Sequence, residues 1–177
     1  MTERDAAAPG QEHQSIAAWA AGFDRRNWSG VLPPHRPDCL GCGPDNPHGH
    51  HMQVRRDGDG VVTEHVFDGR HVGAPGIAHG GAVATVVDDL FGFLLYLVGE
   101  PAVTRHLEVD YRAPVWLGRT YRIRAGQDRR DGRKLFVSAT GTDDSGTETF
   151  TARALFVVVP LEHFAGRPSA EGPPIAP

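Results

Sequence analysis

The sequence predicts an α+β protein in which a curved antiparallel sheet wraps around one long helix. Residues 80–98 form an apolar run with only two charged side chains, long enough for about five helical turns. Two short segments that alternate apolar and polar residues precede this run and four follow it, with turn-forming residues between them. Strands joined by such short turns pair as antiparallel neighbours, so this order favours an α+β fold.

The composition fits one globular domain. The chain has 177 residues, of which 40% are hydrophobic and 23% charged, and its formal net charge is -4. This balance gives no basis for binding nucleic acid or an anionic membrane. The first residues lack the basic start and apolar core of a signal peptide, so we expect a cytoplasmic protein.

The two ends of the sequence differ from its middle. We expect a flexible start over residues 1–12 and a disordered tail over 165–177, with a single domain over 13–164 between them. Residues 13–25 carry apolar side chains at helical spacing and predict a short amphipathic helix. Residues 31–49 are crowded with proline and glycine, so an ordered loop is expected there.

Six strands are expected around the central helix. They cover residues 51–55, 61–67, 103–111, 120–127, 134–142 and 147–159. A turn at 56–60 joins the first two strands, and a loop at 68–78 leads into the helix. Because the helix is apolar on nearly every face, it should be buried inside the curved sheet.

The helix start and two acids inside the helix are the candidate chemical groups. His79-Gly80-Gly81 opens the helix and leaves backbone N–H groups that attract negative charge, including the developing charge on a carbonyl oxygen. Asp88 and Asp89 lie in an apolar run, where an unpaired carboxylate is costly. Buried acids tend to be paired or to take part in chemistry. We expect Asp89 to pair with an arginine or a helix N–H.

Four segments, in this order, resemble one family. They are CLGCGPDNPHG at 39–49, GIAHGG at 76–81 followed by Asp88, LEVDYRAP at 107–114, and the GRK turn at 132–134. Together they are similar to hotdog-fold acyl-CoA thioesterases, in particular the branch with phenylacetyl-CoA-type and long-chain acyl-CoA enzymes. The resemblance implies the hotdog fold and hydrolysis of acyl-CoA to free acid and CoA in lipid metabolism, with no cofactor.

The resemblance also implies roles for individual residues. It makes Asp88 the general base on water or the direct nucleophile, with Thr104 helping to hold that water. The backbone N–H of Gly80 or Gly81 binds the carbonyl oxygen as an oxyanion hole, and His79 shapes this loop and polarises the carbonyl site. The alternatives are a loop-fixing hydrogen bond for His79 and a plain strand hydroxyl for Thr104.

Binding of CoA calls for basic side chains, because CoA carries a 3′-phosphate and a pyrophosphate. Basic residues flank the turn at 132–134, although a solvated hairpin tip would have the same composition. The residues that we assign to substrate and CoA binding are Asn46, His71, Gly73, Arg130, Arg133 and Lys134.

Spacing along the helix predicts a dimer. Gly81 and Asp88 are separated by about 10 Å along the helix axis, at about 1.5 Å per residue. One thioester carbonyl cannot contact both groups in a single chain. If both act together, the acid must come from a second, antiparallel copy, which predicts a two-fold dimer with two composite sites. Two such dimers could associate further into a tetramer.

A metal site is the main alternative use of the cysteines. Cys39 and Cys42 form a Cys-x-x-Cys pair with His48, His50 and His51 close behind, a composition that occurs in zinc sites. The histidine spacing is irregular and no second cysteine pair exists, so we expect no metal but a buried loop against the acyl pocket. No disulfide framework is implied, and no βαβ pattern supports a redox role.

Two other functions remain open. A hotdog hydratase or dehydratase would place its Asp and His five residues apart at the helix start, whereas His79 and Asp88 are nine apart. A non-catalytic acyl-CoA-binding module would not need an acid within an apolar helix. Both observations favour the hydrolase.

Overall fold

The computed structural model describes residue 21 and residues 28–164. The expected flexible start at 1–12 and tail at 165–177 lie outside these residues, as does the expected helix at 13–25 apart from residue 21.

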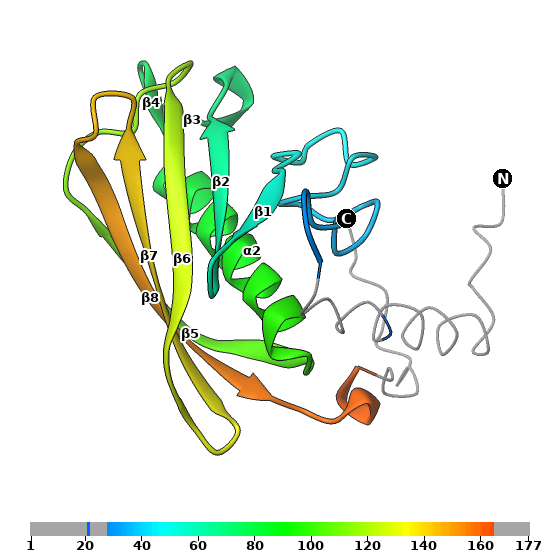
Figure 1. Cartoon of the computed structure of the whole chain (residues 1–177). Coiled ribbons are helices and arrows are strands. Elements are labelled where there is room, and N and C mark those ends of the chain that lie inside the picture. The colour runs from blue at the N-terminus through cyan, green and yellow to red at the C-terminus, as the bar shows by residue number, and fades with distance from the viewer. Residues whose placement is uncertain (1–20, 22–27, 165–177) are drawn as a thin grey trace, which may run out of the picture.

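A six-stranded antiparallel sheet curves around helix α2 (Gly80–Val98), as Figure 1 shows. In sheet order the strands are β1 (Val54–Asp57), β2 (Gly60–Val66), β6 (Thr120–Asp131), β7 (Lys134–Asp143), β8 (Glu148–Val158) and β5 (Ala102–Tyr111). The predicted α+β architecture with a central helix is confirmed.

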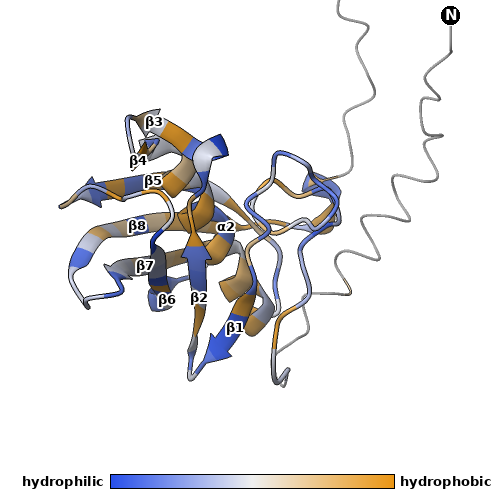
Figure 2. Cartoon of the chain, turned by 90° about the horizontal axis from the view of Figure 1, so that it is seen from above, coloured by the Kyte–Doolittle hydropathy of each residue, from blue (hydrophilic) through white to orange (hydrophobic). Residues whose placement is uncertain are grey.

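Helix α2 supplies much of the core. Its buried residues are Val83, Val86, Val87, Leu90, Phe91, Phe93, Leu94, Leu95 and Tyr96. Figure 2 shows the helix largely in the colours of apolar residues where it lies against the strands. By length and composition this helix could cross a bilayer, but its apolar side chains belong to the core cluster formed with the sheet.

Strand β6 is longer than the sequence predicts. It continues to Asp131, because its pairing with β7 runs on to Asp131 opposite Lys134 around a bulge between Gln127 and Arg129. The bulge and the charged residues interrupt the apolar–polar alternation, so the expected end at 127 is too early. The other strands begin and end within three residues of their expected positions.

The segment before the helix is more ordered than the expected loop at 68–78. It contains a 3-10 turn at Gly69–His71 and a two-stranded ladder of β3 (Val72–Ala74) with β4 (Ile77–Ala78). These short elements hold the chain close to the start of α2.

Strand β5 forms one edge of the sheet and carries a bulge. Among the described strands it pairs only with β8, and its register shifts between Thr104 and His106. Alternation in a regular strand would send Thr104 and Leu107 to opposite faces. With the bulge, Leu107 packs at the core and Thr104 contacts Asp88 of the helix. The sequence-based prediction that 103–111 alternates without interruption is therefore wrong.

Candidate active site

The first turn of α2 presents one free backbone N–H. His79 caps the helix in an extended conformation, and its Nδ1 accepts a hydrogen bond from the Gly81 N–H at 2.9 Å. Gly81, one of the two predicted oxyanion donors, is therefore already engaged. Within the described residues the Gly80 N–H has no hydrogen-bond partner. Gly80 remains the available donor at the positive end of the helix dipole.

A groove of about 430 Å³ opens beside Gly80. It is lined mostly by apolar side chains from the helix start and from residues 111–115. The Tyr111 hydroxyl donates to the Gly80 carbonyl at 2.6 Å, and Arg112 forms an ion pair of 2.7 Å with Glu148. The sequence singled out 107–114 only by resemblance, and gave Tyr111 and Arg112 no role.

Asp88 lies further along the helix and faces β5. The Thr104 hydroxyl donates to its Oδ1 at 2.9 Å, across 16 residues of sequence. Burial raises the pKa of Asp88, while the Thr104 hydrogen bond opposes this rise. A half-buried carboxylate of raised basicity, held by one hydroxyl, can accept a proton from water. The structure thus brings two of the predicted catalytic residues together.

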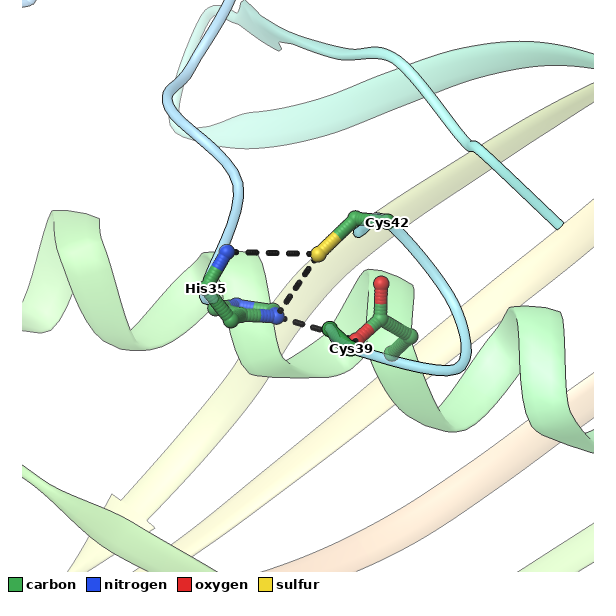
Figure 3. Close-up of side chains that lie close together, drawn as sticks. His35, Cys39 and Cys42 are labelled. Carbon is green, nitrogen blue, oxygen red and sulfur yellow. Dashed lines mark hydrogen bonds and ion pairs between the residues drawn. The ribbon is translucent and has the colours of Figure 1, made fainter. Parts of the chain in front are cut away.

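Asp89 points to the other side of the helix, into the loop at 31–49. Its Oδ1 lies 2.9 Å from His35 Nδ1 and accepts a hydrogen bond from the Cys39 thiol at 3.1 Å. Cys42 joins the group through its Sγ, 3.4 Å from His35 Nδ1 and 3.2 Å from the His35 backbone N–H, which donates to it (Figure 3). The expected arginine or helix N–H partner of Asp89 is therefore wrong.

Electrostatic interactions within this cluster are strong. Burial lowers the pKa of His35, but hydrogen bonds to Asp89 and Cys39 outweigh it and raise the pKa to about 9. The hydrogen bond from Cys42 lowers the pKa of Cys39, whereas the same bond and burial raise the pKa of Cys42. Burial raises the pKa of Asp89. Sequence reasoning missed His35, although its His-x-x-x-Cys-x-x-Cys spacing to the two cysteines was a local signal, whereas its partner Asp89 lies 54 residues away.

The histidines that follow the cysteines in sequence do not join this cluster. His50 is buried with its Nδ1 3.3 Å from Nε2 of His65, and burial lowers the pKa of His50 to about 4 and that of His65 to about 3. His51 Nε2 lies 2.6 Å from the Asn46 carbonyl. The Asn46 side chain bonds to two backbone groups of its own loop, so this predicted substrate contact acts as a loop organiser here.

His71 and Gly73 support the helix start. The His71 ring is buried and stacks on His50 at 3.9 Å, and its backbone carbonyl accepts the His79 N–H at 2.7 Å. A Cβ at Gly73 would lie 2.6 Å from Cα of His79, so only glycine allows this approach. Both residues lie close to the Gly80 groove without lining it.

The predicted basic contacts lie elsewhere. Arg130 forms an ion pair with Glu100, just beyond the C-terminal end of α2, and lines a groove there with Leu97 and Val98. Arg133 lies in the turn between β6 and β7, and Lys134 is the first residue of β7. In one chain, most of the roughly 27 Å length of α2 separates this end from Gly80. The structure therefore does not bring these residues to the helix start.

A family model described as "Thioesterase superfamily" matches residues 75–150. This part of the chain, somewhat less than half of it, is therefore similar to the thioesterase superfamily. The matched segment contains the whole of α2, strands β5 to β7 and the Gly80 groove, while His35, Cys39 and Cys42 lie outside it.

Curated relatives of the chain include proteins named acyl-coenzyme A thioesterase THEM4. The protein from Rattus norvegicus is 38% identical over 87 residues, covering 48% of this chain and 37% of the relative. The protein from Xenopus laevis is 40% identical over 88 residues, covering 48% of this chain and 39% of the relative. The matches thus span less than two fifths of these relatives.

Solved structures share the fold. Protein RHA08564, a thioesterase superfamily protein, has a TM-score of 0.66 at 21% identity, covering 88% of this chain and 81% of that one. The E. coli PaaI protein of the phenylacetic acid degradation operon has a TM-score of 0.59 at 14% identity, and the match covers 63% of this chain and 81% of that one. Protein smu.793 from Streptococcus mutans, bound to acetyl CoA, has a TM-score of 0.58 at 22% identity, and the match covers 61% of this chain and 88% of that one. The predicted hotdog fold is confirmed.

Proposed function

We propose that this domain hydrolyses acyl-CoA thioesters to free acid and CoA. The observation that carries the proposal is that two groups such a reaction needs face the same edge strand. Gly80, whose N–H is free, and Asp88 both contact β5: the Tyr111 hydroxyl donates to the Gly80 carbonyl, and the Thr104 hydroxyl donates to the Asp88 carboxylate. Similarity to proteins named acyl-coenzyme A thioesterase supports the substrate class.

The same edge strand supports a two-fold dimer. An exposed strand edge pairs readily with a second copy of itself in antiparallel orientation. A register that places Thr104 opposite Tyr111 of the second copy also places Arg105 opposite Asp110, a favourable cross-strand charge pair. In this arrangement Asp88 of one copy faces Gly80 of the other, and the two-fold axis creates two composite sites.

The proposed reaction follows from these groups. The thioester oxygen accepts a hydrogen bond from the Gly80 N–H, which stabilises the negative charge that develops on it. Asp88 of the second copy takes a proton from water as the water oxygen bonds to the carbonyl carbon. The carbon–sulfur bond then breaks, and the proton passes to the CoA sulfur. Direct attack by Asp88, followed by hydrolysis of the anhydride, would use the same placement.

The first experiment measures free-thiol release from a panel of acyl-CoAs. We expect Asp88→Asn to lower kcat by 10²–10⁴-fold, the range for loss of a general base. Asp144→Asn, which changes an exposed carboxylate at the β7–β8 turn, is the matched control and should keep wild-type turnover. Acyl-CoA binding without turnover in the wild type would contradict the proposal and favour a binding module.

The oxyanion donor can be removed without changing the fold. Gly80 is the first helical residue, where proline is tolerated, and His79 before it has φ -63° and ψ 135°, which suits a residue preceding proline. Gly80→Pro removes the N–H, whereas Gly80→Ala adds the same Cβ, 3.2 Å from the Tyr111 hydroxyl, and keeps the N–H. We expect Gly80→Pro to lose about 10²–10³ in kcat relative to Gly80→Ala. Equal activity of the two variants would exclude this N–H.

Mixing the two inactive chains tests the composite site. A dimer of one Gly80→Pro chain and one Asp88→Asn chain has one site with both groups intact and one with neither. We expect activity to return after subunit exchange. If both groups acted within one chain, each chain would stay inactive and mixing would restore nothing.

A further inference from the structure

We propose that His35, Cys39, Cys42 and Asp89 bind one Zn²⁺, or a divalent transition-metal ion of similar preference. One ligand atom from each residue lies within 4.8 Å of all the others. The first three follow a His-x-x-x-Cys-x-x-Cys spacing in the loop at 31–49, and the fourth comes from the middle of α2. The site would join the loop to the helix, a function separate from hydrolysis.

The separations between donor atoms fit tetrahedral coordination. Metal–ligand bonds of about 2.0–2.3 Å at tetrahedral angles place neighbouring donors about 3.3–3.8 Å apart. His35 Nδ1 lies 3.4 Å from Cys42 Sγ and 2.9 Å from Asp89 Oδ1. Cys39 Sγ lies 3.1 Å from the same oxygen. These measured donor pairs need to separate by less than about half an ångström to accept the ion.

Two glycines make this close approach possible. A Cβ at Gly41 would lie 2.3 Å from Cγ of Asp89, and a Cβ at Gly92 would lie 2.8 Å from the His35 ring. Neither glycine has the positive φ that would itself require glycine. Gly92 even weakens the helix relative to alanine. At both positions, glycine is therefore needed because a side chain would collide with the cluster.

The cluster also holds buried polar atoms whose bonding capacity is unused. Asp89 Oδ2 and His35 Nε2 are buried with no hydrogen-bond partner in the described part of the chain. The side chains of Asp89 and His35 are only 11% and 15% exposed. His35 is the one basic side chain that contacts this buried carboxylate among the described residues, and a divalent cation would balance the charge of the carboxylate together with two deprotonated thiols.

The donor set selects the metal and its role. Two sulfurs, one imidazole nitrogen and one carboxylate oxygen suit Zn²⁺, whereas Mg²⁺ and Ca²⁺ require oxygen ligands. Four protein ligands fill a tetrahedral sphere and leave no position for substrate, so the ion would be structural. Asp88, one residue before the fourth ligand, stays outside the site and free for the hydrolysis proposed above.

The test is the metal content of the full chain, purified with a thiol reductant present and measured by plasma mass spectrometry. We expect about one zinc per chain. After removal of the metal, titration with Co²⁺ should reach one equivalent and give thiolate charge-transfer bands with the intense visible bands of a tetrahedral ion. Reduced wild-type chain that is metal-free and gives no such bands with Co²⁺ would overturn the proposal, and would leave a hydrogen-bonded cluster.

Three variants assign the ligands. Cys42→Ser and Asp89→Asn should each lose the bound metal or bind it at least tenfold more weakly, because each removes one donor. His48→Gln changes an exposed histidine of the same loop and should bind like the wild type. Unchanged binding in both ligand variants would also overturn the assignment. If a ligand variant fails to fold, the wild-type Co²⁺ spectrum decides, and none of these readouts depends on thioester hydrolysis.

Discussion

Asp88 and Asp89 are neighbours in the sequence but face different sides of helix α2. Successive helix positions point about 100° apart, so one carboxylate faces β5 and the other faces the N-terminal loop. On the β5 side, Asp88 has one hydrogen-bond partner among the described residues, Thr104. On the loop side, Asp89 meets His35 and Cys39. Burial raises the pKa of both acids, so burial alone does not distinguish them.

The partners distinguish the two acids. A carboxylate held by a single hydroxyl keeps an oxygen free for water or substrate. A carboxylate surrounded by an imidazole and two thiols is committed to that cluster and holds a loop against the helix. On such a helix, the reactive acid is the one whose neighbours leave a carboxylate oxygen free for water or substrate.

Exchange of each acid for its amide should separate the two sides most strongly. We expect Asp88→Asn to lose 10²–10⁴ in kcat while it keeps its metal and its Tm. Asp89→Asn should lose the bound metal and have a lower Tm. Its turnover per folded molecule should stay within about tenfold of the wild type. Thiol release, metal content and calorimetry on the same preparations measure these effects. Loss of turnover in a folded, metal-loaded Asp89→Asn would show that the roles are exchanged.

The β5 side of the helix could be predicted from the sequence to a large extent. The apolar run fixes α2, and two acids inside it stand out because unpaired carboxylates are rare in such a run. The bulge in β5 could not be predicted, because one extra residue leaves no clear signal in a ten-residue strand. The contact between Thr104 and Asp88 depends on that bulge, and so came only from resemblance.

The contacts on the loop side were much harder to predict from the sequence. Cys39 and Cys42 are followed by histidines at 48, 50 and 51, which are the ligands that the disfavoured zinc alternative would use. The chain path instead directs His50 towards His65 and brings His35 to the cysteines. The His-x-x-x-Cys-x-x-Cys spacing does place His35 near the cysteines, but local spacing cannot show its contact with Asp89, which lies 54 positions away.

Acidification should lower the stability of the folded chain through two buried histidines, His50 and His65. In the unfolded chain they take up protons near their ordinary pKa of about 6.5, whereas the folded pKa is about 4 for His50 and about 3 for His65. The unfolded state therefore binds more protons between pH 6.5 and 4, and stability falls as pH drops through this window. The slope is at most about 1.4 kcal/mol per pH unit for each histidine.

Urea unfolding at several pH values measures this slope. We expect His65→Gln to flatten it, because one of the buried groups no longer titrates, and His48→Gln to leave it unchanged. An equally steep slope in His65→Gln would place the acid sensitivity elsewhere in the molecule.

A methyl group at Gly92 should lower the metal affinity of the cluster less than the loss of a ligand does. Gly92→Ala places a Cβ 2.8 Å from the His35 ring, which must move away from its cluster. We expect metal affinity to fall by about 10–100-fold, the range for residues that orient a ligand. In the metal-free chain the ring can move, so the better helix propensity of alanine should leave stability unchanged or higher by up to about 1 kcal/mol.

Competition with a chelator measures the metal affinity, and Gly126→Ala is the matched control. A Cβ at Gly126 meets nothing within 4 Å, so that variant should bind metal like the wild type. Wild-type affinity in Gly92→Ala would mean that the His35 ring is not held where the cluster requires it.

Removal of one hydroxyl should give the smallest effect and sharpen the β5 side. Thr104→Val keeps a β-branched side chain suited to a strand but cannot donate to Asp88. A net hydrogen bond of about 0.5–1.5 kcal/mol corresponds to a fall in kcat of roughly 2- to 12-fold, with little change in KM, because the hydroxyl positions the acid rather than the substrate. Thr104→Ser keeps the donor and should stay within about twofold of the wild type. If serine and valine lower kcat equally, the shape of the strand matters and the hydroxyl does not; if neither has an effect, Thr104 is only a strand residue and Asp88 is held by its burial alone.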